Sequence, residues 1–137
     1  MLNRKIMLVA VGFVVVAAVA FSLLNTRNTC CAAPANAIQS ISPTGYQDQF
    51  ISTSHLLIDV RTAEEFASGH IDGAVNIPVD ALQSRLNEIP ADQPVVVYCR
   101  SGNRSATASQ ILAEAGYTAV YDLGGINAWT AQGFPVQ

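Results

Sequence analysis

Lysine is almost absent from this chain, and basic side chains of any kind are scarce. The single lysine is Lys5, and after residue 37 four arginines face ten acidic residues, which gives residues 38–137 a net charge of −6, four minus ten. Nucleic-acid binding depends on many cations that neutralise phosphates, so this composition argues against it. A length of 137 residues also leaves too little chain for two ordinary domains.

Cysteine is equally sparse, and the three cysteines share no motif. Cys30 and Cys31 are adjacent, and Cys99 stands far from them. Without CxxC or Cys/His spacing, neither a disulfide framework nor a metal site is indicated. We expect Cys99 to be a free thiol. Cys30 and Cys31 are interpreted as incidental or as removed with a leader, and pairing between chains is the alternative.

One long apolar run contains no charge at all, from residue 6 to residue 24. In a helix, at about 1.5 Å per residue, its length comes close to the roughly 30 Å thickness of a bilayer's hydrocarbon core. Arg4 and Lys5 precede the run and only Arg27 follows it closely, so the positive-inside rule predicts a cytoplasmic N-terminus. The rest of the chain would then lie outside the cytoplasm, in a periplasm or on the outer membrane face.

The run therefore predicts a signal peptide or a transmembrane anchor over residues 1–24, with cleavage and retention equally open. A buried core helix is the third interpretation, disfavoured because the run is apolar on every face. Residues 25–37, with their Asn, Thr and Ala, are interpreted as a linker. Residues 38–137 are interpreted as the domain.

Short apolar runs alternate with helical patterns through this domain. Strands are predicted at residues 56–60, 74–77, 95–98 and 119–121, and helices at residues 62–69, from 80 to just before Pro90, from about 104 or 105 to 115, and around 125–129. In the third helix Ala108, Ile111, Leu112 and Ala115 share one face, which predicts their burial. Alternation of this kind predicts an open, doubly wound α/β domain with a mainly parallel sheet.

Cys99 directly follows the predicted strand at residues 95–98 and precedes a loop that opens the third helix. In open α/β sheets this carboxyl edge holds the ligand crevice, and Gly-rich and Ser-rich loops turn backbone N–H groups inward as an anion site. These dipoles, with the helix N-terminus, favour thiolate over thiol. We therefore expect a thiolate nucleophile in a pocket for a small anion. The candidate anion-binding residues are Arg100, Ser101, Gly102, Asn103, Arg104 and Ser105.

The alternative reading of Cys99 is a small buried hydrophobe at the end of a core strand. A polar, doubly basic loop directly after it favours the functional reading. Asp59 and Arg61 end another predicted strand at the same edge, and we expect them to form an ion pair that supports the active loop.

Four motifs in order carry a family resemblance. They are Leu57-Ile-Asp-Val-Arg61 with Glu64-Glu-Phe66, Gly69-His-Ile-Asp-Gly-Ala-Val-Asn-Ile-Pro78, Tyr98-Cys-Arg-Ser-Gly-Asn-Arg-Ser105, and Leu123-Gly-Gly-Ile-Asn-Ala-Trp129 through Gly133-Phe-Pro135. Through them the domain resembles the single-domain rhodanese, or thiosulfate sulfurtransferase, family over nearly all of residues 38–137.

The resemblance implies a sulfur relay without a metal or an organic cofactor. The Cys99 thiolate would take the outer sulfur of thiosulfate, release sulfite, and pass the sulfur from a persulfide to cyanide or a thiol. The expected partners are thus a small sulfur anion and a thiophilic acceptor, together with the membrane if residues 6–24 are retained. We expect a monomer.

Two other functions remain open: a catalytically idle rhodanese-like binding module, and a cysteine phosphatase or arsenate reductase. Cys99 favours the enzyme over the idle module. Phosphatases and arsenate reductases use a loop patterned Cys-x5-Arg, which would require arginine where this chain has Ser105.

The remaining polar and aromatic residues have simpler readings. His70 is interpreted as a structural hydrogen bonder in a turn, and His55 as a surface residue. Glu64 and Glu65 fit a helix N-terminus. Tyr121, Trp129 and Phe134 are interpreted as packing residues.

Overall fold

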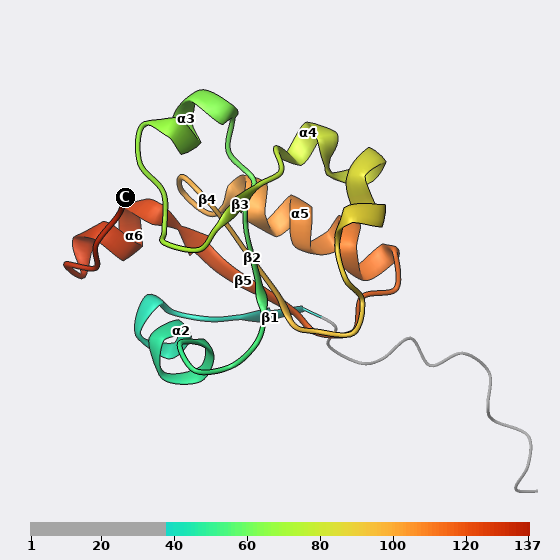
Figure 1. Ribbon diagram of the computed structural model, residues 1–137, viewed down its shortest axis with the longest axis horizontal. Helices are drawn as coiled ribbons and strands as arrows, with labels where there is room; N and C mark the ends of the chain where they lie inside the picture. Colours follow the sequence, from blue (N-terminus) through green and yellow to red (C-terminus); the bar gives the residue numbers. More distant parts are fainter. Residues whose placement is uncertain (1–37) are drawn as a thin grey trace, which may run out of the picture. The chain divides into compact units, whose positions relative to one another are not determined.

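The computed structural model describes residues 38–137, which form one parallel sheet with helices on both faces (Figure 1). The predicted leader at residues 1–24 and the linker at residues 25–37 lie outside the described residues. The strands are β1 (Ile38–Ser40), β2 (Leu56–Asp59), β3 (Val75–Asn76), β4 (Val95–Cys99) and β5 (Val120–Gly125). They are arranged in the order β1-β5-β4-β2-β3, and every pairing is parallel.

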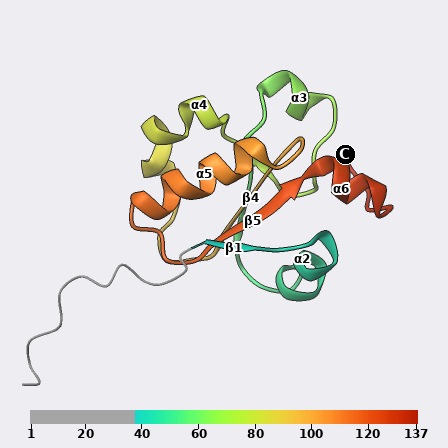
Figure 2. The same ribbon diagram turned by 180° about the vertical axis from the view of Figure 1, so that it is seen from behind.

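Helices cover the sheet from both sides, as the views from the front and from behind show (Figures 1 and 2). They are α2 (Pro43–Phe50), α3 (Ala63–Ala67), α4 (Val79–Leu82), the 3-10 helix η1 (Gln83–Glu88), α5 (Asn103–Glu114) and α6 (Ile126–Ala131). Residues of α4 and α5 contribute to one core cluster, and residues of α2 and α6 contribute to the other. The predicted doubly wound α/β architecture with a parallel sheet is therefore confirmed.

Strand β4 is buried along its whole length because it lies in the middle of the sheet between these layers. Successive side chains of a strand point to opposite faces. Accordingly Val95, Val97 and Cys99 pack in the cluster with α5, whereas Val96 and Tyr98 pack in the cluster with α2 and α6. The periodicity thus directs the Cys99 side chain toward α5.

The chain changes direction between β2 and β4, which are neighbours in the sheet although β3 separates them in sequence. From β2 the chain continues outward to β3, and from β4 it continues in the opposite direction to β5. Ligands of open α/β sheets bind at such a switch point, beyond the carboxyl ends of the strands. Asp59 pairs with Tyr98 in the register, so Asp59 and Cys99 both lie at this edge.

Several predicted element boundaries require correction. β5 extends to Gly125 instead of ending at residue 121, because a register shift opposite Val97 and Tyr98 lets its glycines continue along β4. Helix α5 begins at Asn103, earlier than predicted, because Gly102 serves as its N-cap. Ala115, predicted to be buried, is exposed because it follows the last residue of α5.

The first two described elements were absent from the prediction. β1 is a three-residue edge strand that is exposed throughout, so it lacks an apolar run. The sequence features that mark the start of α2 are its N-cap and a proline. Ser42 accepts a hydrogen bond from the Gly45 N–H, and Pro43 lies in the first turn. Over residues 38–137, none of the helices combines the length and apolar character that a bilayer crossing requires.

Candidate functional site

The Cys99 sulfur lies at the base of a loop that links β4 to α5. The residue is 1% exposed, and its sulfur accepts a hydrogen bond from the Gly102 N–H at 3.0 Å. The sulfur also lies 3.8 Å from the Ser105 hydroxyl oxygen. No cysteine within residues 38–137 is available to pair with it, so the thiol is free there, as predicted.

The loop stabilises the thiolate form of Cys99. Burial raises the pKa of the thiol, but the backbone N–H groups of Ser105, Gly102 and Ser101 and the Ser105 hydroxyl outweigh it, so the pKa lies below its ordinary value. Donors that converge on one sulfur at the start of a helix are the usual environment of a reactive cysteine. The arrangement therefore provides a nucleophile together with a site for negative charge.

Gly102 gives the loop its turn. Its φ of 108° belongs to the left-handed region that L side chains rarely adopt, and the residue caps α5. Ser105 is fully buried in the first turn of the helix, and its hydroxyl oxygen lies 2.9 Å from the Gly102 carbonyl oxygen and 3.2 Å from the Gly124 carbonyl oxygen, either of which can accept its single proton. Ser105 thereby ties the loop to the end of β5.

The glycines that end β5 allow the loop to approach closely. A Cβ atom on Gly125 would lie 2.6 Å from the Arg100 carbonyl oxygen and 2.8 Å from the Ser101 Cα. Those separations are too short for a side chain, so the loop rests directly on the backbone of β5. Gly124 adopts a φ of 79° beside it and donates its N–H to the Asp122 carboxylate at 2.9 Å.

Arg104 has a partner that the sequence did not indicate. Its two terminal nitrogens donate to the Glu65 carboxylate at 2.7 and 2.9 Å. Glu65 belongs to the capping box of α3, where it also accepts from the Thr62 N–H. Its hydrogen bonds with Arg104 are the largest cause that lowers the pKa of Glu65 to about 2, so the pair is ionised at neutral pH. Glu65 therefore does more than stabilise a helix N-terminus.

Arg100 is exposed and, unlike Arg104, forms no salt bridge with the residues that the structure describes. Within residues 38–137 the salt bridges involve Arg61, Arg85 and Arg104, and none involves Arg100. Ser101 and Asn103 are exposed beside it. The guanidinium available for a diffusing anion at the loop is thus that of Arg100.

Asp59 and Arg61 form the expected ion pair, buried at the end of β2. Arg61 donates to both carboxylate oxygens, with its closest nitrogen 2.6 Å from Oδ2. The same nitrogen donates to the Gly69 carbonyl oxygen at 2.7 Å, and the Asn76 amide donates to the Asp59 and Arg61 carbonyls. These contacts hold the segment after β2 at the switch point. They connect β2, β3 and the turn at Gly69, and none of them reaches the loop from Cys99 to Ser105, so support of that loop by the ion pair stays a prediction.

Neither histidine is hydrogen-bonded to Cys99. His70 stacks on Phe66 at 3.8 Å between ring centroids and exchanges backbone hydrogen bonds with Gln137, which fits the predicted structural role. The prediction of His55 as a simple surface residue is wrong, because it is half-buried and bonded to the Tyr46 hydroxyl at 2.8 Å. Among residues 38–137, no cluster of three or more His, Cys, Asp or Glu side chains is arranged to hold a metal ion.

Sequence reasoning missed two parts of the site, Glu65 and Gly125. The Thr-x-x-Glu spacing placed Glu65 in a capping box but could not reveal a partner 39 residues away. The Gly-Gly pair was a possible signal for close backbone approach. The segment that this pair approaches, the loop after Cys99, follows only from the pairing of β4 and β5 in the structure.

Comparison with models of protein families shows which family the chain belongs to. The model of the rhodanese-like domain matches residues 42–132. The chain is a member of the rhodanese-like family. This agrees with the motifs around Asp59, Cys99 and Gly125 and with the parallel fold described above.

Individual relatives agree with this membership. A sulfurtransferase of Allochromatium vinosum is 46% identical over 82 residues, which cover 59% of this chain and 77% of that protein. Thiosulfate sulfurtransferase 16, chloroplastic, of Arabidopsis thaliana is 35% identical and covers 72% of this chain and 92% of that protein. The crystal structure of a rhodanese-related protein from Thermoplasma volcanium has a TM-score of 0.66 at 31% identity, over 72% of this chain and 97% of that one. The expectation of a rhodanese-type transferase is therefore confirmed.

Proposed function

We propose that this rhodanese-like protein transfers a sulfane sulfur from thiosulfate, or a similar donor, through a persulfide on Cys99 to cyanide or a thiol. One observation carries the proposal: the Cys99 sulfur receives converging N–H donors at the switch point of the sheet. The names of the sulfurtransferase relatives support the same chemistry.

In the first step the Cys99 thiolate attacks the outer sulfur of thiosulfate. A new sulfur–sulfur bond forms on Cys99, the sulfur–sulfur bond of thiosulfate breaks, and sulfite leaves with the electron pair. The guanidinium of Arg100, exposed at the mouth of the loop, attracts the dianionic donor and stabilises the departing sulfite. The charge of Arg104 is balanced by Glu65, and the pair holds the first turn of α5 in position beside the nucleophile.

In the second step an acceptor removes the sulfur. The terminal atom of the persulfide is about 2 Å from Sγ, the ordinary length of a sulfur–sulfur bond. Cyanide or a thiolate attacks this atom, and the Cys99 thiolate leaves. The loop N–H groups that lower the pKa of Cys99 also make it a good leaving group. No oxidant or reductant is consumed.

Steady-state assay of the purified full chain tests this function directly. Sulfite and thiocyanate should appear in equal amounts from thiosulfate and cyanide, with the double-reciprocal lines parallel, as expected of a covalent two-step mechanism. Cys99→Ser should remove the turnover and leave the melting temperature unchanged within a few degrees. Retained turnover in Cys99→Ser would overturn the assignment.

The alternatives make different predictions in the same assay. A binding module would fold and release no sulfite from any donor. A phosphatase or arsenate reductase would act on phosphate esters or arsenate, but here Arg104 falls one position too early for that loop, and Ser105 binds Gly102 and Gly124 instead. The geometry of the loop favours the sulfurtransferase.

We also propose that the domain works outside the cytoplasm, either anchored by residues 6–24 or released after cleavage. The support is the charge-free run between Arg4–Lys5 and Arg27. Protease added to intact cells, after the outer barrier is opened where one exists, should degrade the domain. N-terminal sequencing of the purified protein would distinguish anchor from leader. A protected domain would contradict this topology.

A further inference from the structure

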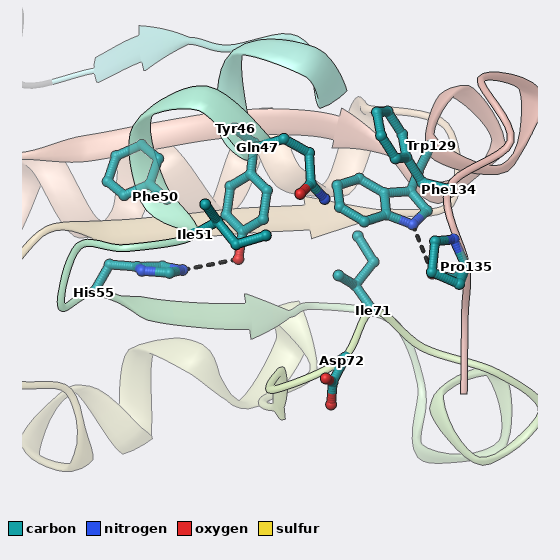
Figure 3. A pocket seen from close by; sticks show the side chains of 10 residues that line it. All are labelled: Tyr46, Gln47, Phe50, Ile51, His55, Ile71, Asp72, Trp129, Phe134 and Pro135. Atoms are coloured by element: carbon teal, nitrogen blue, oxygen red, sulfur yellow. Dashed lines mark hydrogen bonds between the residues drawn. The ribbon is translucent and has the colours of Figure 1, made fainter.

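A cavity of about 410 Å³ lies on the other side of the sheet from Cys99, in the layer formed by α2 and α6 (Figure 3). Its walls include Tyr46, His55, Ile71 and Trp129, with Asp72 at its rim. None of its lining residues belongs to the loop from Cys99 to Ser105. The volume falls within the usual range for small-molecule sites.

Aromatic side chains make up half of the lining residues. Tyr46 meets Trp129 edge to face with centroids 5.6 Å apart, and Trp129 contacts Phe134 at 4.8 Å. The indole N–H is already used, since it donates to the Pro135 carbonyl oxygen at 2.9 Å. The indole therefore offers no donor to an anionic ligand, and of these three rings Phe134 is the one that is only half-buried.

The Tyr46–His55 pair orients the polar atoms of the cavity. His55 Nδ1 lies 2.7 Å from the Thr53 carbonyl oxygen, which can only accept, so this nitrogen carries the ring proton. His55 Nε2 therefore accepts the Tyr46 hydroxyl proton at 2.8 Å. The phenol oxygen is left with lone pairs and no proton to offer a ligand.

Asp72 adds negative charge to these acceptors. The residue is exposed at the rim, next to Ile71 (Figure 3). Burial, and then the Asp72 carboxylate, raise the pKa of Tyr46 to about 12, so the phenol stays neutral at physiological pH and its oxygen lies in the negative potential of Asp72. The net charge of −6 over residues 38–137 acts in the same direction.

From these observations we infer that the cavity is a binding site for a free organic cation, in which an aryl body carries an ammonium group. The body packs against Ile51 and Phe134, which line the cavity and keep exposed surface. The cationic group donates hydrogen bonds to the Tyr46 oxygen and approaches the Asp72 carboxylate. The site is separate from sulfur transfer, so its ligand is bound and not consumed.

Trp129 is the only tryptophan of the chain, so its fluorescence reports directly on the cavity. The full chain is titrated with phenethylammonium, with phenethyl alcohol and with 3-phenylpropionate, which differ mainly in charge. We expect a saturable change with phenethylammonium and binding at least about tenfold weaker for the anion. Asp72→Asn should weaken the binding of phenethylammonium about three- to fivefold, because its charge is exposed.

Asp48→Asn is the matched control, since Asp48 is an exposed acid on α2 that does not line the cavity. It should leave the affinity unchanged, and Tyr46→Phe, which keeps the ring but removes the acceptor oxygen, should lower it. N-acetylargininamide represents a side chain of a partner protein. Four results would each overturn the proposal. Two concern the ligand: saturation by N-acetylargininamide but not by phenethylammonium, and equal affinity for 3-phenylpropionate and phenethylammonium. The others are equal effects of Asp48→Asn and Asp72→Asn, and the absence of any saturable fluorescence change.

Discussion

The Glu65 carboxylate and the Arg104 guanidinium form a two-bond ion pair, at 2.7 and 2.9 Å, that connects α3 to the first turn of α5. Both side chains are about one-third exposed or less. The pair fixes the direction of a guanidinium beside the Cys99 loop, and α3 in turn is fixed by its capping box. A residue from a separate segment thus completes the setting of the nucleophile.

The first prediction concerns Glu65→Gln. Loss of the carboxylate frees Arg104 to adopt other rotamers, so kcat/KM for thiosulfate should fall about three- to tenfold, while Cys99 still forms its persulfide. Glu64→Gln is the control, because this neighbouring carboxylate is exposed and makes no bond to Arg104. Steady-state kinetics of both variants provide the measurement. Equal effects of the two substitutions would contradict a positioning role for Glu65.

Arg100→Gln should raise KM for thiosulfate about fivefold or more and reduce the salt dependence of kcat/KM, because the exposed guanidinium attracts the dianion from solution. Stability should stay unchanged. Arg85→Gln removes the same charge from η1, where Arg85 is paired with Glu88, and should leave KM unaltered. If KM for thiosulfate does not change in Arg100→Gln, Arg100 has no role in donor binding.

Ser105→Ala tests how the loop lowers the pKa of Cys99. The wild-type thiol, with its pKa below the ordinary value, should react with iodoacetamide as thiolate at lower pH than a free cysteine does. Removing the hydroxyl deletes one stabilising group and leaves the backbone N–H donors. The midpoint of the pH–rate profile should therefore move upward, toward the value of an unperturbed thiol. A midpoint that stays in place or falls would show that the hydroxyl does not stabilise the thiolate.

Gly125→Ala should displace the loop, because the new Cβ would clash with the Arg100 carbonyl oxygen and the Ser101 Cα. Overpacking of this kind costs about 1–3 kcal/mol. Gly124→Ala is the informative control, since it introduces strain at a φ of 79° without any atom within 4 Å of the new Cβ. Thermal melts and sulfite release should show that Gly125→Ala loses more activity for a similar loss of stability. The reverse order would contradict the close approach.

The central part of the fold was predictable because its signals are local. Strand β4 is a continuous apolar run, α5 repeats apolar residues every three or four positions, and the capping box at Thr62 marks the start of α3. β1 was not predicted, since it is held by pairing with β5 rather than by burial of its own side chains.

The candidate site likewise has one part that local sequence patterns predicted and another that depends on tertiary contacts. Cys99 and its loop follow one another in sequence, so their succession indicated an anion-binding nucleophile. The Glu65–Arg104 pair joins residues 39 positions apart, and the contact of Gly125 with the loop arises from the register shift between β4 and β5. Relationships of this kind depend on tertiary packing, which no local pattern encodes.

The most direct test of the account is mass spectrometry of the full chain after incubation with thiosulfate, followed by digestion with trypsin. Cleavage after Arg85 and Arg100 yields the peptide of residues 86–100, in which Cys99 is the single cysteine. The account predicts one added sulfur on this peptide, formed together with sulfite, removed by cyanide and absent from Cys99→Ser. A folded, reduced protein that releases sulfite without sulfur on this peptide would contradict the Cys99 persulfide.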